Sequence, residues 1–217
     1  MSRRIIGLTG NIATGKSAVM RLAAERGALT IDADGVVHEL LAGDAGIQAQ
    51  VVAAFGESVR RAEGGIDRAA LGVIVFGDPA RLRQLEAILH PAVRLAIARR
   101  VAGSDAPVIV IEAIKLLEGP LADMCDQTWV TACARETQMA RLRVCRGMDE
   151  ASAAARIDAQ SPQADKIARA DVVITTDGLL RETEAQVAAA WGALAGGGGQ
   201  TGRGAGEQGR GGEEEGA

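Results

Sequence analysis

The chain has 217 residues, of which 47% are hydrophobic and 24% are charged, and its formal net charge at pH 7 is −4. This composition is typical of a globular protein with one sizeable core, and the negative balance argues against a broad electrostatic surface for nucleic acid. The only aromatic residues are two Phe and two Trp, so a surface that stacks the bases of a single strand is not expected.

The cysteines and the N-terminus bear on the compartment. Cys125, Cys133 and Cys145 are widely spaced, with no C-x-x-C pair, so they suggest neither a disulfide framework nor a zinc site and fit a reducing compartment. The chain enters a strand-like run within four residues, without the apolar segment of a signal peptide or membrane span. We therefore expect a cytoplasmic protein with no membrane partner.

The first motif is a phosphate-binding loop. Residues 10–17 read Gly-Asn-Ile-Ala-Thr-Gly-Lys-Ser and fit G-x-x-x-x-G-K-[ST] at every fixed position. An apolar run, residues 5–9, comes directly before the loop, and a helix-like stretch, Ser17–Arg26, comes directly after it. The motif needs this strand–loop–helix setting, so the alternative of a glycine-rich turn that binds nothing is disfavoured.

Such a loop points successive N–H groups at phosphate oxygens, and the following helix adds its positive N-terminal end. Lys16 is expected to reach the β- and γ-phosphates of ATP, and the Ser17 hydroxyl to hold Mg²⁺. The residues predicted to contact the nucleotide are Asn11, Ile12, Ala13, Thr14, Gly15, Lys16, Ser17 and Ala18.

Two carboxylates follow the second strand. A helix of about ten residues carries the chain about 15 Å away from the loop, and the strand Ala28–Asp32 brings it back about 16 Å. Asp32 and Asp34 should therefore emerge at the same edge of the sheet as Lys16, where α/β folds bind ligands. One carboxylate can accept the proton of an attacking hydroxyl while the other holds a water of the metal shell.

Two other interpretations of this segment remain open. Asp34 could be a helix N-cap without catalytic duty. Residues 32–35 also match the D-x-x-G of GTPases, but they follow Lys16 too closely for a switch loop to lie between, and no N-K-x-D motif occurs.

The rest of the chain alternates strand-like and helix-like segments. The strand-like runs are Arg4–Thr9, Ala28–Ile31, Pro107–Ile111, Thr128–Thr131 and Asp171–Thr175. The helical patterns are 16–26, 34–42, 46–55, 67–76, 79–102, 135–146, 149–159 and 179–194. This alternation predicts an α/β fold, a doubly wound and mainly parallel five-stranded sheet with helices on both faces.

The same pattern divides the chain into parts. We expect one domain over 1–195, whose core comprises 1–33, 107–134 and 171–195. The all-helical stretch 34–106 is expected to form a lobe over the site, and 135–170 a lid. The glycine-rich tail 196–217 cannot bury apolar surface and is expected to be disordered.

Two features of these helical parts concern function. Gln138 and Arg141 share one face of a helix in a segment rich in arginine, which suits a lid that supplies cations and excludes water. A solvated surface helix is the alternative for any single arginine there. His90-Pro91 lies inside an otherwise helical run, so a helix boundary or a bend is expected at that point.

Taken together, these motifs resemble the dephospho-coenzyme A kinases, a family of phosphate-loop kinases, over about residues 4–192. The resemblance rests on Gly7–Gly10 leading into the loop, Ile31–Asp34, Asp67-Arg68 with Leu71 and Phe76, Leu85-Glu86 with His90-Pro91, Leu116–Glu118, Gln138 with Arg141, Arg156-Ile157 with Gln160, and Ala170–Ile174.

The resemblance implies phosphorylation of the ribose 3′-hydroxyl of dephospho-coenzyme A by Mg-ATP, the last step of coenzyme A synthesis. It implies Asp34 as the catalytic base, with Lys16 and Arg141 at the transferred phosphate. Ser17 and Asp32 would serve Mg²⁺, and the acceptor would meet Thr9, Asp34, His90 and Arg68. The expected partners are these two small molecules, with no nucleic acid, and the chain is expected to be a monomer or weak homo-oligomer.

The chain departs from the usual family pattern at several positions. The loop reads Asn11–Thr14 in place of G-I-G-S, and Glu112, Lys115, Cys145 and Thr176 replace the usual aspartate, proline, arginine and asparagine. Arg146 follows Cys145 directly.

Two alternatives remain: a kinase for another small acceptor, such as a nucleoside monophosphate or sugar acid, and a nucleotide-dependent switch protein. The absence of a guanine motif and the paired acids count against the switch.

Overall fold

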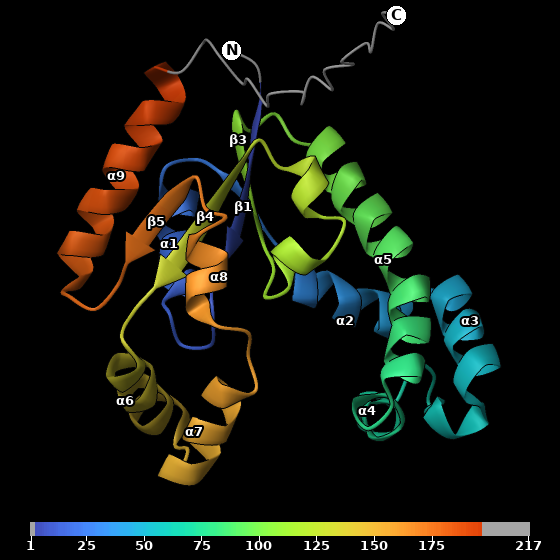
Figure 1. Ribbon diagram of the computed structural model, residues 1–217. Coiled ribbons are helices and arrows are strands. Elements are labelled where there is room, and N and C mark those ends of the chain that lie inside the picture. Colours follow the sequence, from blue (N-terminus) through green and yellow to red (C-terminus); the bar gives the residue numbers. More distant parts are fainter. Residues whose placement is uncertain (1–2, 197–217) are drawn as a thin grey trace, which may run out of the picture.

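The computed structural model describes residues 3–196 (Figure 1). Five strands form one sheet in the order β2-β3-β1-β4-β5, and every neighbouring pair is parallel. The strands are β1 (Arg4–Thr9), β2 (Leu29–Asp32), β3 (Val108–Glu112), β4 (Gln127–Ala132) and β5 (Val172–Thr175). The predicted α/β fold is confirmed, and the sheet is entirely rather than mainly parallel.

Helices cover both faces of this sheet, because side chains alternate along each strand. On β3, Val108 and Val110 pack under α1 (Lys16–Glu25) and α9 (Leu180–Gly196), which share one core with them. Ile109 and Ile111 face the opposite way, toward α2 (Ala33–Gly43) and α5 (Pro79–Ala102). The connection from β1 runs toward β2 at one edge of the sheet, and the connection from β3 runs toward β4 on the other side. The direction of the connections therefore changes between the adjacent strands β1 and β3, where such folds bind ligands.

The stretch between β2 and β3 is helical and has a core of its own. It contains α2, α3 (Ala45–Phe55), the 3₁₀ turn η1 (Glu57–Val59), α4 (Arg68–Phe76) and α5. The core members are Leu41, Ile47, Val51, Val52, Phe55, Val59, Ile66, Leu71, Val75, Leu85 and Leu89. Helix α5 joins this core to the sheet, since its later residues Val93 and Ile97 pack with the strands.

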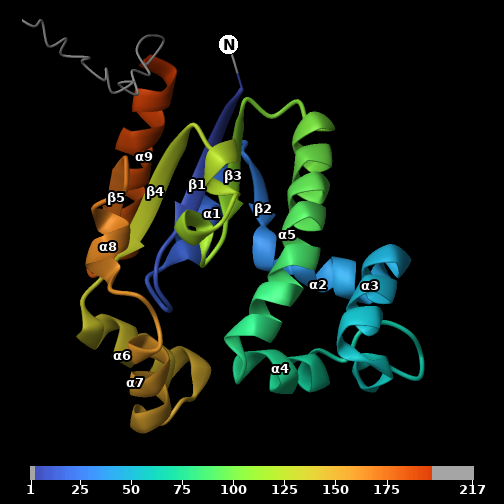
Figure 2. The ribbon, with the colours of Figure 1, turned by 45° about the vertical axis from the view of Figure 1, so that its right-hand side comes forward.

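Helix α5 runs without interruption through Pro91. The predicted helix boundary is therefore wrong, and the predicted bend is what remains: in Figures 1 and 2 the axis of α5 changes direction about midway. Pro91 has no N–H to donate, so one helical hydrogen bond is missing where the axis turns.

Between β4 and β5 the chain forms α6 (Arg135–Arg146), α7 (Glu150–Asp158) and α8 (Gln163–Ile167). Helix α8 was not predicted, because five residues are too short to show a helical period. A small core of Leu142, Ala153 and Ile157 holds α6 against α7 and also touches Ile12 of the phosphate loop. Figure 2 shows α6 and α7 on the side of the molecule that faces α4 and the start of α5.

Within residues 3–196, no helix is both long and apolar enough to cross a membrane. Gly196, the first residue of the predicted tail 196–217, is the last residue of α9, and residues 197–217 lie outside the described residues.

Candidate active site

The phosphate loop connects β1 to α1, and its glycines are required by contacts and conformation. A Cβ on Gly10 would lie 2.3 Å from Thr131 Oγ1, so only glycine lets the loop pass this close to β4. Gly15 has φ 87° and is the N-cap of α1, which has no side-chain cap and no acidic residue in its first turn. The positive end of α1 is therefore left for an external anion.

Ala13 sits at the tip of the loop with φ 60°, and it is the one non-glycine residue within 3–196 that has a positive φ. An L-residue pays about 1–2 kcal/mol for this left-handed conformation. Arg141 Nη1 donates to the Ala13 carbonyl at 3.0 Å, which helps to hold the strained peptide in place.

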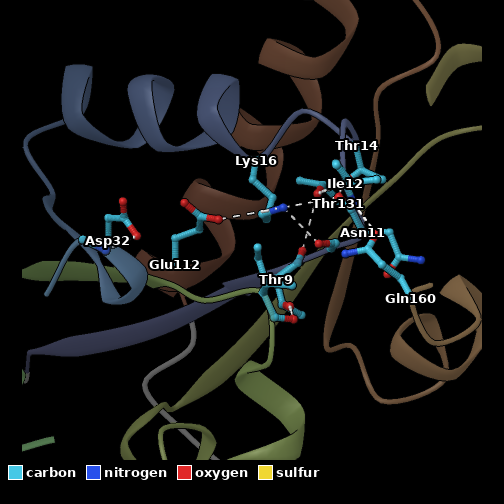
Figure 3. A network of polar contacts seen from close by, with 12 residues as sticks. Thr9, Asn11, Ile12, Thr14, Lys16, Asp32, Glu112, Thr131 and Gln160 are labelled. Carbon is cyan, nitrogen blue, oxygen red and sulfur yellow. Dashed lines mark hydrogen bonds and ion pairs between the residues drawn. The ribbon is translucent and has the colours of Figure 1, made fainter. Parts of the chain in front are cut away.

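The peptide of Ile12 is held from both sides by two glutamines of the 135–170 segment, of which Gln160 is labelled beside Ile12 in Figure 3. Its N–H donates to Gln160 Oε1 at 2.6 Å, and its carbonyl accepts from Gln138 Nε2 at 2.7 Å. Asn11 Nδ2 also donates to the Ser161 carbonyl at 3.0 Å, whereas Asn11 Oδ1 is the one buried side-chain N or O atom within the described residues that lacks a partner. The loop conformation is thus coupled to the packing of α6 and of the α7–α8 connection.

Lys16 lies inside the curve of the loop. Its Nζ donates to the carbonyls of Gly10 and Asn11 at 3.0 and 3.2 Å and lies 3.8 Å from Glu112 Oε1, as Figure 3 shows. Burial lowers the pKa of Lys16, against the raising effect of the Glu112 and Asp34 charges. Burial likewise raises the pKa of Glu112, against the effect of Lys16. Desolvation thus opposes both charges of this pair, which favours their engagement by a polar ligand.

Three carboxylates meet at this edge of the sheet. Asp32 ends β2 opposite Glu112 at the end of β3, and Asp34 lies in the first turn of α2. Asp32 is the N-cap of α2, because its Oδ1 accepts from the Gly35 N–H at 3.0 Å. The cap role that was the alternative for Asp34 therefore belongs to Asp32. The pKa of Asp34 is raised, first by desolvation of its carboxylate and then by the Asp32 charge, although the residue as a whole is exposed.

The oxygen donors of this region fit Mg²⁺. Ser17 is exposed at the second position of α1, and Asp32 keeps carboxylate oxygen for a second contact beyond the cap. Within 3–196 no group of three or more His, Cys, Asp or Glu side chains is arranged to hold a metal by itself. Mg²⁺ commonly takes one or two protein oxygens and completes its shell with phosphate and water, so these residues suit a metal that arrives with a nucleotide.

A cavity of about 470 Å³ adjoins Asp34. Its walls are mainly apolar, with His90 and Lys115 among the few polar groups, and it is lined by Ala33, Asp34, Val37, Phe76, His90, Val93, Ala113, Ile114, Lys115, Gly119, Pro120 and Leu121. The structure thus brings His90 and Asp34 to one cavity. Arg68 is not among these lining residues and lies exposed at the start of α4. Thr9 is buried behind the wall, where its Oγ1 donates to the Ile114 carbonyl at 3.1 Å.

Arg141 points to the end of β5 as well as to the loop. Its guanidinium donates to Thr176 Oγ1 at 3.0 Å and to the Thr176 carbonyl, and Thr176 Oγ1 in turn donates to the Thr14 carbonyl at 2.9 Å. Arg146 lies in the last turn of α6, and its charge contributes to lowering the pKa of Lys16. In this arrangement Arg141 braces the loop, while Arg146 extends its charge toward Lys16.

Comparison with known proteins identifies the family. The family model described as dephospho-CoA kinase matches residues 4–182. The chain belongs to the dephospho-CoA kinase family. A dephospho-CoA kinase of Symbiobacterium thermophilum is 46% identical over 90% of this chain and 83% of its own length. One from Geobacter metallireducens is 44% identical over 86% of this chain and 94% of its own.

Solved structures show the same fold. A crystal structure from Thermus thermophilus superposes with a TM-score of 0.78 at 31% identity, covering 92% of this chain and all of that one. The dephospho-CoA kinase from Campylobacter jejuni superposes with a TM-score of 0.65 at 24% identity, over 89% of this chain and 98% of its own, and at that identity it shows the fold alone.

Some site residues of this dephospho-CoA kinase family member escaped sequence reasoning. Glu112 was noted only as a departure from the pattern, yet its position directly after a predicted strand was a signal that it reaches the same edge as Asp32. Two threonines near strand ends also support the loop: Thr131 lies in β4 with its Oγ1 2.7 Å from Thr14 Oγ1, and Thr176 directly follows β5. The contacts of Gln160 had no such signal, because they depend on how α7 and α8 pack.

Proposed function

We propose that this chain transfers the γ-phosphoryl group of ATP to the ribose 3′-hydroxyl of dephospho-CoA, giving CoA and ADP. One observation carries the proposal: Asp34 lines the 470 Å³ cavity and is also electrostatically coupled to Lys16 of the phosphate loop. A carboxylate shared by an acceptor-sized cavity and a phosphate site is placed to serve both substrates. Membership of the dephospho-CoA kinase family supports the same reaction.

In the proposed mechanism, the phosphates of ATP lie on residues 11–18 at the free N-terminus of α1. Asp34 accepts the proton of the 3′-hydroxyl while the hydroxyl oxygen forms a bond to the γ-phosphorus and the bond between that phosphorus and ADP breaks. Lys16 offsets charge on the transferring group, together with Arg141 or the neighbouring Arg146. Ser17 and Asp32 would hold Mg²⁺, which supplies further positive charge to the phosphates when bound.

The two helical parts take separate roles in this proposal. The 34–106 segment forms the acceptor lobe and contributes His90 to the cavity, whereas 135–170 forms the lid that clamps the phosphate loop. Water must be kept from the γ-phosphate while the acceptor is absent, and closure of such a lid achieves this. A cytoplasmic location and a monomeric or weakly associated state stay predictions.

The test is ADP release from Mg-ATP with and without dephospho-CoA. We expect release to depend on dephospho-CoA and to be far slower with AMP or a sugar acid in its place. Fast release with one of those acceptors would assign a different small-molecule kinase. Tight nucleotide binding with slow hydrolysis, unaffected by every acceptor, would indicate the switch protein instead.

A further inference from the structure

Phe76 is exposed to an extent that nothing in its packing explains. The chain has four aromatic residues, and Trp129, Trp191 and Phe55 belong to or pack against hydrophobic cores. Phe76, the last residue of α4, is 87% exposed. A single exposed apolar side chain is ordinary, but this one also lines the same cavity as Asp34.

The ring of Phe76 has a defined position along α4. Gly72, one turn earlier, is buried, and a Cβ built on it would lie 3.0 Å from Phe76 Cε2 and 3.3 Å from Cδ2. The ring therefore lies back over the bare backbone of Gly72. Figure 2 shows the junction of α4 and α5, where Phe76 lies, on the side of the lobe that faces α6 and α7. The Phe76 side chain is also one of the groups that line the cavity.

We propose that Phe76 stacks on the adenine of the acceptor and so sets the specificity of this site for an adenosine-containing acceptor. The inference rests on the proposed function. The reacting 3′-hydroxyl and the base belong to the same ribose. An acceptor whose 3′-hydroxyl meets Asp34 must therefore place its base about one sugar ring away from Asp34. The cavity beside Asp34 offers apolar walls, including Val37, Val93 and Leu121, for the flat base.

Among the groups that line the cavity, Phe76 is the one with an apolar aromatic ring, the other aromatic ring being the imidazole of His90, and a purine face is best covered by an aromatic ring. The other apolar part of the proposed acceptor is its pantetheine arm, a flexible chain on the 5′ side of the ribose. A flexible chain gains no special contact from a ring at one fixed place, whereas a flat base does. The geometry therefore assigns the ring to the base rather than to the arm.

The test compares Phe76→Ala with Val73→Ala. Val73 is 83% exposed on the same helix but does not line the cavity, so its loss controls for surface effects. Removing a stacking aromatic typically weakens binding about 5- to 100-fold. We expect Phe76→Ala to raise the KM for dephospho-CoA by that factor, with the KM for ATP and thermal stability unchanged, and Val73→Ala to match the wild type.

Fragments identify which part of the acceptor meets the ring. With a saturating non-hydrolysable ATP analogue in the donor site, adenosine and pantetheine are each titrated, using Phe76→Trp fluorescence as the signal. We expect adenosine to quench this fluorescence and pantetheine to leave it unchanged; quenching by pantetheine alone would overturn the assignment. An unchanged KM for dephospho-CoA in Phe76→Ala would overturn it too, whereas a wild-type enzyme without dephospho-CoA-dependent ADP release would overturn the proposed function itself.

A second variant keeps the ring and moves it. Gly72→Ala adds a Cβ whose near neighbours are atoms of the Phe76 ring, and alanine favours a helix more than glycine does. We expect this variant to fold at least as stably as the wild type but to show a raised KM for dephospho-CoA. A stable Gly72→Ala variant with an unchanged KM would show that the ring position does not matter.

Discussion

Asp34 differs from its two carboxylate neighbours in what holds it. Asp32 caps α2 and Glu112 pairs with Lys16, whereas no hydrogen bond within the described residues engages the Asp34 side chain. Burial and the Asp32 charge raise its pKa, so its affinity for a proton exceeds that of an ordinary aspartate. A carboxylate that is unengaged and more basic is the better acceptor of a hydroxyl proton.

Asp34→Asn should therefore lower kcat by about 10²–10⁴ while ATP affinity stays close to the wild-type value, because the amide cannot accept the proton. Turnover is measured by coupled ADP release, and ATP affinity by calorimetry. Asp44→Asn is the matched control, since Asp44 caps α3 through the Ile47 N–H, does not line the cavity, and asparagine preserves a helix cap. Equal losses of turnover and ATP binding in Asp34→Asn would contradict the assignment of the base.

The strained residue of the loop gives a second prediction at this scale. Glycine relieves the left-handed strain at Ala13 but also makes the unfolded chain more flexible, so Ala13→Gly should gain about 0.5–1 kcal/mol net. The same change at Ala188, which is exposed in the middle of α9, should cost about 1 kcal/mol. Urea unfolding measures both variants. A destabilised Ala13→Gly would mean that the brace from Arg141 removes the strain.

At the scale of elements, α6 and the α7–α8 connection act on the phosphate loop through one peptide. The hydrogen bonds of Gln138 and Gln160 hold the Ile12 peptide from opposite sides. Losing either bond leaves one side of the Ile12 peptide unheld. A binding nucleotide must then order that peptide, at a cost of about 1 kcal/mol for each lost bond. Gln160→Met and Gln138→Met should each raise the KM for ATP about 3- to 10-fold, with a smaller effect on the KM for the acceptor.

Helix α9 provides the control for that experiment. Gln186 of α9 holds the Thr175 peptide in the same two-sided way, accepting from its N–H and donating to its carbonyl at 2.9 Å each, but Thr175 is the last residue of β5 and not part of the phosphate loop. Gln186→Met should lose similar stability and leave the KM for ATP unchanged. If all three variants change the KM for ATP alike, the hold of Gln138 and Gln160 on the Ile12 peptide has no special role in ATP binding.

Elements also mark what the sequence could predict. The five strands are short apolar runs rich in valine and isoleucine, which the sequence pattern shows. The nearly equal lengths of α1 and β2 are enough to predict that Asp32 and Asp34 lie beside the loop. Which strand lies next to β1 was not predicted, and neither was the pair of Lys16 with Glu112 that depends on it. The Gln160 contacts and the exposed ring of Phe76 depend on tertiary packing, which periodicity does not encode.

On the scale of the whole molecule, α5 connects the acceptor lobe to the sheet. Leu85 and Leu89 pack in the lobe core, Val93 and Ile97 pack against the strands, and Pro91 lies between the two sets. The bend in α5 at Pro91 therefore sets the angle at which the lobe meets the sheet. The cavity is shaped by that angle, because its lining comes from α2, α4, α5 and the segment after β3.

Pro91→Ala restores the missing N–H of the helix at an exposed position, so it opens no void. Proline in a helix interior costs up to about 3 kcal/mol relative to alanine, and we expect the variant to be more stable by about 1 kcal/mol or more. A straighter α5 would turn the lobe and misalign the cavity with the loop. The KM for dephospho-CoA should then rise while the KM for ATP, set by the loop and lid, stays constant.

Arg94→Ala, an exposed change on the same helix, should leave both constants unaltered. A stabilised Pro91→Ala enzyme with a wild-type KM for dephospho-CoA would mean that the lobe keeps its angle without the bend, through the contacts of α2 alone.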